Sequence, residues 1–323
     1  MRSLDLLIAA PSDPAGLAGW GDVAFAQSLQ RALRGCGLAT RLLFRDTYES
    51  ATPPPAGTGL LLLRGKFRPR PEWLSQATYC TRLLWQISWP LDISAAELAS
   101  YDRLFVASAQ DRQRLAYLSG KPTHVLPQAT DFRMAGSPRL PSRGLLFVGN
   151  TRGLVRPLVL GFGRSGLPLT LIGSGWEAYG LRAERQSISN HALPALYGES
   201  LAVLNDHHGA MRDFGYLNNR VFDVLACGVP VITDMAPGCP EALLPGIVVH
   251  GPDDDPQATL AEVMRRRSKP GLLQRVSGVV ASEHSFQARA EALLAACGLG
   301  SGLADAGGWT RGAALAAPAD LWP

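Results

Sequence analysis

Short apolar runs that alternate with segments of helical periodicity are the feature that most restricts the fold of this chain. Leu4–Ala10 and Leu60–Leu63 are apolar runs of strand length, and Asp22–Gly35 between them carries apolar residues at helical spacing. The alternation continues to His124–Leu126, stops in a Pro- and Gly-containing stretch at 131–143, and then restarts. This order predicts two α/β units, each a parallel sheet covered by helices on both faces.

We therefore expect two Rossmann-like, doubly wound domains that face each other across a cleft. The predicted boundaries are 1–130 for the N-terminal unit, 131–143 for a linker, 144–297 for the C-terminal unit and 298–323 for a Gly- and Ala-rich tail. Ligands of such sheets bind at the carboxyl ends of the strands, where loops carry the functional side chains.

The composition excludes several classes of protein. Hydrophobic residues make up 46% and charged residues 18% of the 323 residues, which is typical of a globular chain and not of a disordered one. A net charge of +4, with a basic run only at 265–267, does not predict nucleic-acid binding. No apolar run approaches the roughly 20 residues of a membrane span. Five dispersed cysteines predict reduced thiols, no zinc site and a cytoplasmic protein.

The first strand of the second unit leads into a segment with two arginines. Asn150 is suited to cap a following helix. Arg152 and Arg156 are four residues apart, so they share a face if this turn is helical. Two guanidinium groups at a strand-to-helix junction can bind a diphosphate, although a solvated face explains the same spacing.

Two further turns of this unit carry candidate residues. The GSGW turn contains Gly173, which allows close backbone approach to a ligand or simply a tight turn. The strand Leu201–Asn205 then leads into Asp206, His207 and His208. Neighbouring histidines on an extended chain point to opposite sides, which argues against a two-His metal site and places one of them at the cleft. For Asp206, a structural role in the turn and a functional role stay open as alternatives.

The helix expected at Asn219–Ala226 keeps two charges on an otherwise apolar segment. Arg220 and Asp223 are three residues apart and lie on one face of the helix. A carboxylate just before the ACG turn is well placed to accept two hydrogen bonds from vicinal hydroxyls such as those of a ribose.

These residues resemble a known family. The runs NNRVFDVLACGVPVITD and LNDHHGAMRDFGYL look like the C-terminal domain of GT-B glycosyltransferases, closest to the spore-maturation-protein-like branch of glycosyl transferases group 1. FVGNTRG, SGWE, SFQARAEALL and GDVAFAQSLQRALRGCG fit the same branch, so the resemblance covers roughly residues 1 to 297. It implies transfer of a sugar from a nucleotide-diphospho-sugar, bound by the C-terminal domain, to a glycan, glycolipid or other hydroxyl acceptor bound by the N-terminal domain.

The resemblance also implies roles for individual residues. Asp223 takes the place of the second carboxylate of the family's E-x7-E pattern, which holds the donor ribose, and Arg152 and Arg156 take the places of the basic pair on the diphosphate. GWGD, Gly19 to Asp22, occupies the glycine loop that faces the donor phosphates. The expected donor-binding set is Gly21, Asn150, Arg152, Arg156, Gly173, Asn219, Arg220 and Asp223.

One position departs from the family pattern. Eight residues before Asp223 the chain has Gly215, and an alignment on the FG pair falls on Arg212, so neither supplies the first carboxylate. Asp213 or Asp206 can substitute for it. The stereochemistry of transfer depends on this position.

The catalytic candidates are Asp22, Asp206 and His207. Asp22 is the best-placed base of the N-terminal unit, at a glycine loop that opens a helix, although a helix N-cap explains it as well. A retaining, front-face reaction needs no enzymic base and is favoured. Fixed arginines can stabilise the leaving diphosphate, so no metal and no further cofactor is expected. Trp85 and Trp89 can stack on an acceptor sugar or belong to the core.

Two other functions stay open as alternatives: a sugar-nucleotide epimerase on the same fold, and a non-catalytic GT-B-like module that binds a sugar nucleotide or a partner. Two locations also stay open: a purely cytoplasmic protein, and a cytoplasmic protein that associates peripherally with the inner face of the membrane.

Overall fold

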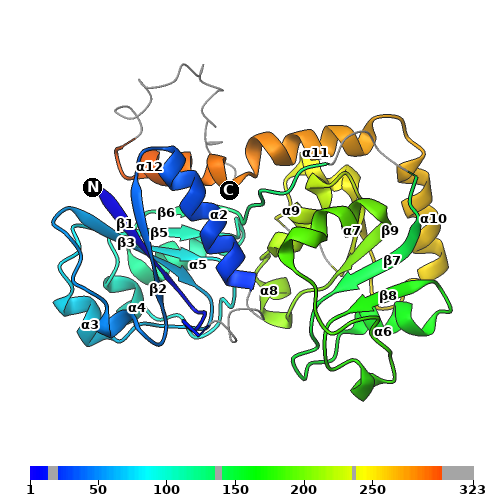
Figure 1. Ribbon diagram of the computed structural model, residues 1–323, viewed down its shortest axis with the longest axis horizontal. Coiled ribbons are helices and arrows are strands. Elements are labelled where there is room, and N and C mark those ends of the chain that lie inside the picture. The colour runs from blue at the N-terminus through cyan, green and yellow to red at the C-terminus, as the bar shows by residue number, and fades with distance from the viewer. Residues whose placement is uncertain (14–20, 135–139, 235–237, 300–323) are drawn as a thin grey trace, which may run out of the picture.

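The computed structural model describes residues 1–13, 21–134, 140–234 and 238–299. Two parallel sheets with flanking helices lie side by side, the first on the left and the second on the right of Figure 1. This arrangement confirms the predicted fold class of two Rossmann-like α/β units. Of the tail predicted at 298–323, all but the first two residues lie outside the described part of the chain.

The first unit is built on a sheet of order β2-β1-β3-β4-β5-β6 in which all neighbouring strands are parallel. Its strands are β1 (Ser3–Ile8), β2 (Ala39–Phe44), β3 (Thr58–Arg64), β4 (Arg82–Gln86), β5 (Arg103–Val106) and β6 (Thr123–Val125). Its helices are α2 (Gly21–Gly35), α3 (Pro71–Gln76), α4 (Ala95–Ala99) and α5 (Arg112–Ser119).

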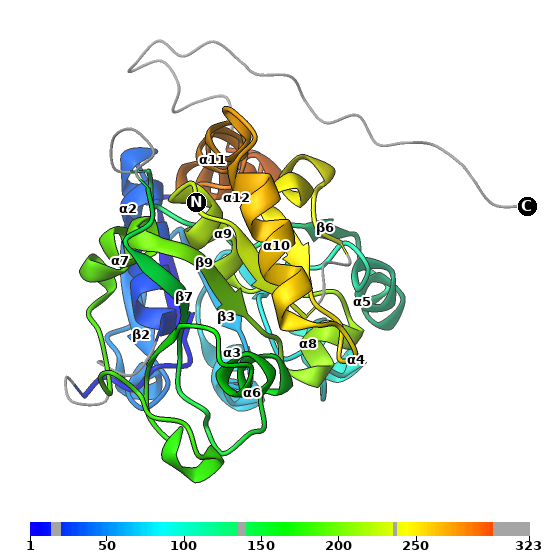
Figure 2. The same ribbon diagram turned by 90° about the vertical axis from the view of Figure 1, so that its right-hand side faces the viewer.

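The second unit is built on a parallel sheet of order β11-β10-β9-β7-β8. Its strands are β7 (Arg143–Val148), β8 (Leu169–Ile172), β9 (Ser200–Asn205), β10 (Val231–Thr233) and β11 (Ile247–Val249). Its helices are α6 (Pro157–Arg164), α7 (Leu193–Glu199), α8 (Gly209–Asp213), α9 (Asn219–Ala226), α10 (Pro256–Arg267) and α11 (Leu272–Glu283). Helices α7 and α10 lie on opposite sides of strands β7 and β9 (Figure 2).

Both sheets are wound in the same way. In each, the chain adds its second strand on one side of the first strand and then returns to add the third strand on the other side, giving β2-β1-β3 and β8-β7-β9. Ligands of doubly wound sheets bind in the crevice at such a reversal of strand order, outside the carboxyl ends of the strands. The winding therefore directs attention to the loops that follow β1, β7 and β9.

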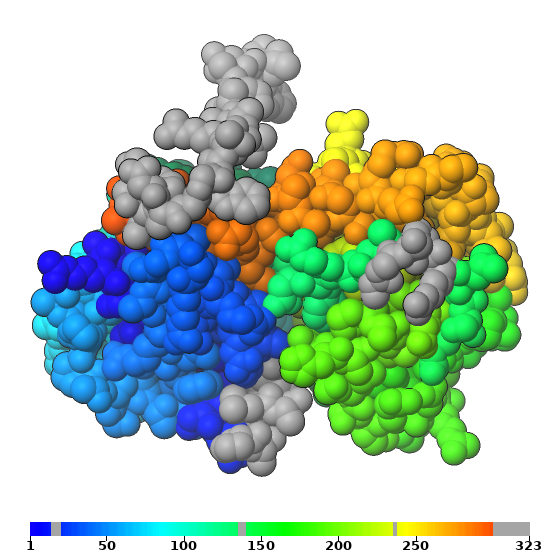
Figure 3. Space-filling model, turned by 45° about the horizontal axis from the view of Figure 1, so that its top comes forward, coloured from blue at the N-terminus to red at the C-terminus, as the bar shows by residue number. Residues whose placement is uncertain are grey.

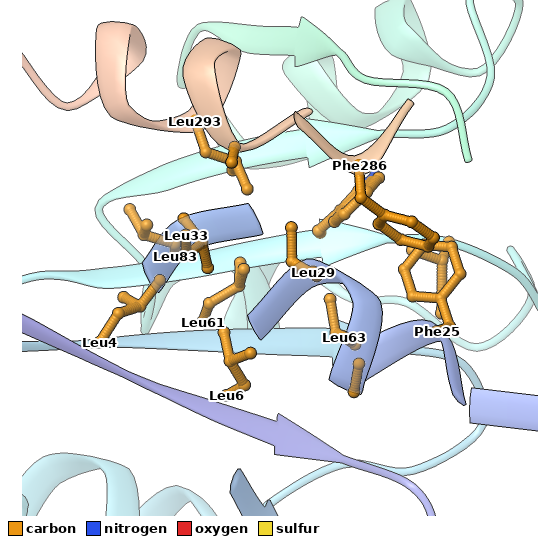
Figure 4. Close-up of a cluster of buried hydrophobic side chains, with 14 of the residues drawn as sticks. Leu4, Leu6, Phe25, Leu29, Leu33, Leu61, Leu63, Leu83, Phe286 and Leu293 are labelled. Carbon is orange, nitrogen blue, oxygen red and sulfur yellow. The ribbon is translucent and has the colours of Figure 1, made fainter. Parts of the chain in front are cut away.

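The last helix, α12 (Phe286–Ala296), crosses from the second unit back to the first. It follows α11 across the top of the molecule and packs against α2 (Figures 1 and 3). Phe286 meets Phe25 of α2 edge to face at 4.7 Å, and Leu293 lies over Leu29 and Leu33 (Figure 4). The sequence prediction placed this helix within the C-terminal unit at 144–297, whereas its apolar face completes the core of the first sheet.

None of the helices in the described part of the chain is both long and apolar enough to span a membrane. The apolar runs serve the sheets instead. Because helices cover both faces of each sheet, strands such as β3 are buried along their whole length and are apolar at nearly every position.

Shortening a buried side chain of α12 tests this crossover. Leu293 is 2% exposed, so Leu293→Ala should lower the free energy of unfolding by about 2–5 kcal/mol, because it removes buried methyl groups and leaves a cavity. Leu140→Ala is the matched control, since Leu140 is 93% exposed and its shortening should change stability by less than about 0.5 kcal/mol. Equal denaturation midpoints for the two variants would contradict the docking of α12 on α2.

Candidate functional site

The two sheets present the carboxyl ends of their strands to each other. Lys66 follows β3 and Trp89 follows β4, and they meet His208, which follows β9 of the other unit. The Lys66 ammonium lies 3.7 Å from the centre of the Trp89 ring, and the His208 ring stands edge to face to Trp89 at 6.3 Å. The loops predicted to carry the chemistry therefore converge between the units.

A cleft beside this contact runs between α2 of the first unit and α7 and α9 of the second. Its walls comprise Gly21, Ala24, Phe25 and Ser28 on one side, Asn190, Leu193, Tyr197, Asn219, Arg220 and Asp223 on the other, and Ala129, Asp131, Phe132, Val148 and Phe286 between them. Three residues of the predicted donor-binding helix therefore face one cavity together with the start of α2.

Asp223 is a buried carboxylate on α9 that opens onto this cleft. Its Oδ2 atom accepts a hydrogen bond from Asn219 Nδ2 at 3.0 Å, and Thr130, just before the linker, forms another hydrogen bond with its side chain. Burial raises the pKa of Asp223 to about 7, against the opposing effects of Thr130 and of the positive charge of Arg220. A desolvated carboxylate of this kind destabilises the fold, so its presence needs a reason other than packing.

Arg220 lies across the ends of two strands. Its Nη2 atom donates to the carbonyl of Val148 at 2.5 Å, its Nη1 atom donates to Asn205 Oδ1 at 3.3 Å, and the guanidinium lies 4.9 Å from the centre of the Phe147 ring. These contacts fix the side chain at the point where β7 and β9 end. A guanidinium held in this way is a preorganised cation on the wall of the cleft.

The loop between β7 and α6 carries both arginines of the predicted pair. Helix α6 begins at Pro157, so residues 150–156 are not helical and the condition for a shared helical face of Arg152 and Arg156 is not met. Arg152 has a left-handed backbone with φ of 53° and an exposed side chain. Asn150 caps no helix, because its Oδ1 atom accepts a hydrogen bond from the backbone of Ser174 at 2.9 Å.

Arg156 and Asp206 form an ion pair inside the second unit. Arg156 Nη1 lies 2.6 Å from Asp206 Oδ1, and Arg156 Nη2 donates to the carbonyl of Asn150 at 3.0 Å. Arg156 Nε is buried and has no hydrogen-bond partner among the described residues. The carboxylate of Asp206, which was a catalytic candidate, is thus engaged in holding the arginine at the end of β7.

Gly173 is required by the packing of two loops. Its φ is 134°, and an added Cβ would lie 2.3 Å from the carbonyl oxygen of Gly149. An added Cβ at Gly175 would meet Thr151 at the same distance, and Trp176 Nε1 donates to Gly149 at 3.0 Å. The GSGW turn therefore lies directly against the loop that carries the arginines, which corresponds to the tight-turn alternative for Gly173.

The two neighbouring histidines have different surroundings. The side chain of His207 has no exposed surface; its Nδ1 atom lies 2.7 Å from Asp234 Oδ1, and its Nε2 atom faces Asn205 at 3.3 Å. His208 is only half-buried and reaches the facing unit at Trp89. Burial lowers the pKa of His208, as do the positive charges of Arg156 and Arg152. The structure thus places His208 at the contact with the facing unit, and His207, the catalytic candidate, in the interior.

Asp22 lies in the first turn of α2, next to Gly21 on the wall of the cleft. Burial raises the pKa of its carboxyl, and the positive charge of Arg152 from the facing unit opposes that effect. The two other members of the GWGD motif, Gly19 and Trp20, lie outside the described residues. The Asp22 carboxyl is therefore the catalytic candidate of the first unit, and it faces the loop 150–156 that carries Arg152 and Arg156.

The sequence prediction missed one contributor to the site, Thr130, and left two alternatives for another, Trp89. Thr130 comes from the segment before the linker, and no local pattern connects it with Asp223 because the two are close only in the folded chain. Trp89 was distinguished from Trp85 only by the fold: Trp85 is fully buried and donates to the carbonyl of Leu126, whereas Trp89 is half-exposed. In the described part of the chain, no group of three or more His, Cys, Asp or Glu side chains is arranged to hold a metal ion.

Comparison with known proteins adds a family and a fold. Residues 152–295 match the model of a family described as glycosyl transferase-like. No curated protein matched the sequence. Among solved structures, the chain is similar to T4 phage BGT in complex with its UDP-glucose substrate, with a TM-score of 0.60 and 10% identity over 91% of this chain and 99% of that chain.

Two further solved structures have similar scores. AviGT4, a glycosyltransferase involved in avilamycin A biosynthesis, has a TM-score of 0.60 and 15% identity over 90% of this chain and 96% of its own. Sucrose-phosphate synthase from Thermosynechococcus elongatus has a TM-score of 0.58 and 15% identity over 92% and 98%. At these identities the likeness shows a shared fold, that of GT-B glycosyltransferases.

Replacing Asp223 by Asn tests the energetic cost of its burial. The pKa of Asp223 is about 7 in the folded chain, whereas the unfolded chain releases this proton near the ordinary aspartate pKa of 3.8. The stability of the wild-type chain should therefore fall, relative to that of Asp223→Asn, as the pH rises from about 4 through 7. At pH 8 the variant should be more stable by an amount on the order of 3 kcal/mol. Chemical denaturation at pH 5 and pH 8 measures the difference, and a pH-independent difference would contradict the raised pKa.

Proposed function

We propose that this chain, whose residues 152–295 match the model of the glycosyl transferase-like family, transfers a sugar from a nucleotide-diphospho-sugar donor to a hydroxyl group of a glycan, a glycolipid or a related acceptor. The GT-B fold supports this proposal, because it presents two sets of strand ends to one cleft and so can hold two substrates. The donor belongs to the second unit and the acceptor to the first.

The buried carboxylate of Asp223 is the observation that carries the proposal. It lines the cleft beside Asn219 and Arg220, and its side chain accepts hydrogen bonds from Asn219 and Thr130. A carboxylate in this position can accept hydrogen bonds from the two hydroxyls of a ribose, as in dinucleotide-binding sheets. The destabilisation that its burial causes is then offset by a function in donor binding.

The donor diphosphate would lie along the arginines at the ends of β7 and β9. Arg152, Arg156 and Arg220 stand around this point, and Arg156 has one buried donor, Nε, with no partner among the described residues. Preorganised cations stabilise the negative charge that develops on a leaving diphosphate. We therefore propose a metal-independent transfer in which these arginines take that role.

The acceptor would enter from the side of the first unit, where Trp89, Lys66 and Asp22 face the donor loops. We propose transfer with retention of configuration at the anomeric carbon. Asp206 and His207 are both engaged in contacts inside the second unit, so neither is free to act as a base. A front-face reaction does not require one.

Nucleotide binding tests the donor site. The wild-type chain should be stabilised against heat by one of UDP, GDP, ADP or dTDP and by the corresponding nucleotide sugars, which it should hydrolyse slowly. Asp223→Ala should weaken this binding by about tenfold to a hundredfold, since it removes two hydrogen bonds to the ribose. Asp253→Ala is the matched control, because Asp253 is an exposed acid of the same unit after β11.

The outcomes separate the possible functions. Stabilisation without turnover of any nucleotide sugar would favour a binding module, and an epimerised donor would favour an epimerase. If no nucleotide binds, both enzymatic functions fail. If Asp223→Ala binds as tightly as Asp253→Ala does, the ribose assignment fails.

The role of Asp22 tests the stereochemistry. Under retention, Asp22→Asn should lower turnover by less than about tenfold, since the carboxyl then contributes only to the field around Arg152. The product released from the donor should keep the anomeric configuration of the donor, which NMR measures directly. A fall of about 10²–10⁴-fold together with an inverted product would identify Asp22 as a general base and overturn the retaining proposal.

A further inference from the structure

A short segment of the second unit is part of the core of the first. Met211 and Tyr216, which lie between β9 and α9, are buried in the apolar cluster formed by one face of the first sheet, together with Leu62, Leu104 and Leu115. In Figure 1 this segment, at α8, lies between the two units. The connection from β9 to α9 therefore has its two ends in the donor unit and its middle in the acceptor unit.

Polar contacts fix the middle of this connection in place. Tyr216 Oη donates to Asp111 Oδ2 at 2.6 Å, and Asp111 is 1% exposed and also pairs with Arg114. Ser108 Oγ donates to the carbonyl of Phe214 at 2.6 Å, and the Arg114 guanidinium lies 4.6 Å from the centre of the Phe214 ring. A charged acceptor at a buried position makes the Tyr216 hydrogen bond a strong one.

The same docking explains why residue 215, one of the two positions that align with the family's first carboxylate, is a glycine. Gly215 has φ of 69°, and an added Cβ would lie 2.6 Å from Gln110 Oε1 and 3.2 Å from Ser108 Oγ. Any side chain at this position would thus be strained and would collide with the facing unit. The position is occupied by the contact between the units and cannot present a group to the donor.

Both ends of the connection reach the donor site. Upstream are Asp206, which holds Arg156, and His208 at the contact with Trp89. Downstream, Asn218 Nδ2 donates to the carbonyl of Asp206 at 3.3 Å, and Asn219 begins the helix that carries Asp223. A displacement of the middle of the connection would move these ends relative to the first unit.

We infer that Asp111 and Tyr216 form a clamp between the units and act as positioning residues for sugar transfer. The clamp holds the donor loops in a fixed orientation to the acceptor unit. This inference rests on the proposed function for its effect on turnover, but the fixed orientation of the units does not depend on that function.

The test compares Tyr216→Phe with Tyr101→Phe in the full chain. Tyr101 lies in the same apolar cluster, and its buried hydroxyl has no hydrogen-bond partner among the described residues, so the control removes the same atom without breaking the clamp. Small-angle X-ray scattering should give a larger radius of gyration for Tyr216→Phe only. Turnover of the donor sugar should fall by about tenfold or more in Tyr216→Phe, because small misplacements of reacting groups are costly.

The affinity for the nucleoside diphosphate separates positioning from folding. It should change by less than about twofold in Tyr216→Phe, because Arg220 and Asp223 are held by contacts outside the clamp. Gly215→Ala should reproduce the loss of turnover, whereas Gly166→Ala, which has a similar φ of 78° in open space, should not.

The clamp is overturned if Tyr216→Phe and Tyr101→Phe have the same radius of gyration. Its positioning role is overturned if turnover is the same in both, or if Tyr216→Phe loses nucleotide affinity in proportion to turnover. If the wild-type chain binds no nucleotide, the proposed function fails, and the scattering comparison still decides whether the units are clamped.

Discussion

Parallel pairing of the strands is the constraint from which the rest of this structure follows. A parallel sheet sends every strand-to-helix loop to the same edge, and covering both of its faces with helices leaves that edge as the place for polar chemistry. Here two such edges are turned toward each other, so that Lys66 and Trp89 of one sheet meet His208 of the other. The helix α12 and the segment around Tyr216 then keep the edges together.

The burial of the Asp223 carboxylate is unfavourable for the stability of the fold, and such an unfavourable residue can indicate a function. The helix that carries it is apolar at its neighbouring positions, and a residue chosen only for packing or helix propensity would not be a buried carboxylate. Its pKa near 7 reflects burial that is only partly compensated by Thr130 and Arg220. The fold tolerates this penalty at the wall of a cavity, where a polar ligand can provide the hydrogen bonds that the protein does not.

Elements with strong local patterns could be predicted from the sequence, and contacts between elements could not. The helix at Asn219–Ala226 matches the prediction in both bounds, because its apolar spacing and the glycine turn after it are local signals. Strand β2 was missed because it is an edge strand, half-exposed and interrupted by Arg41. Helix α11 was missed because Gly278 and two serines weaken its helical pattern.

For the candidate site too, local patterns could be predicted from the sequence and contacts between elements could not. That charged side chains follow β7 and β9 could be read from the order of the residues. The pairing of Arg156 with Asp206 could not be read in this way, nor could the fact that His208, and not His207, contacts the facing unit at Trp89. Each depends on contacts with the other unit or with a neighbouring loop.

The close packing of the GSGW turn against the arginine loop has a consequence for engineering donor preference. Gly173 packs against the backbone of Gly149, Gly175 packs against Thr151, and Trp176 donates a hydrogen bond to the carbonyl of Gly149. The conformation of each loop therefore depends on the other. A loop transplanted alone from another enzyme would meet a partner that does not fit it. The two loops should therefore be exchanged together. Grafts or directed libraries at this site should change residues 149–152 and 173–176 at the same time.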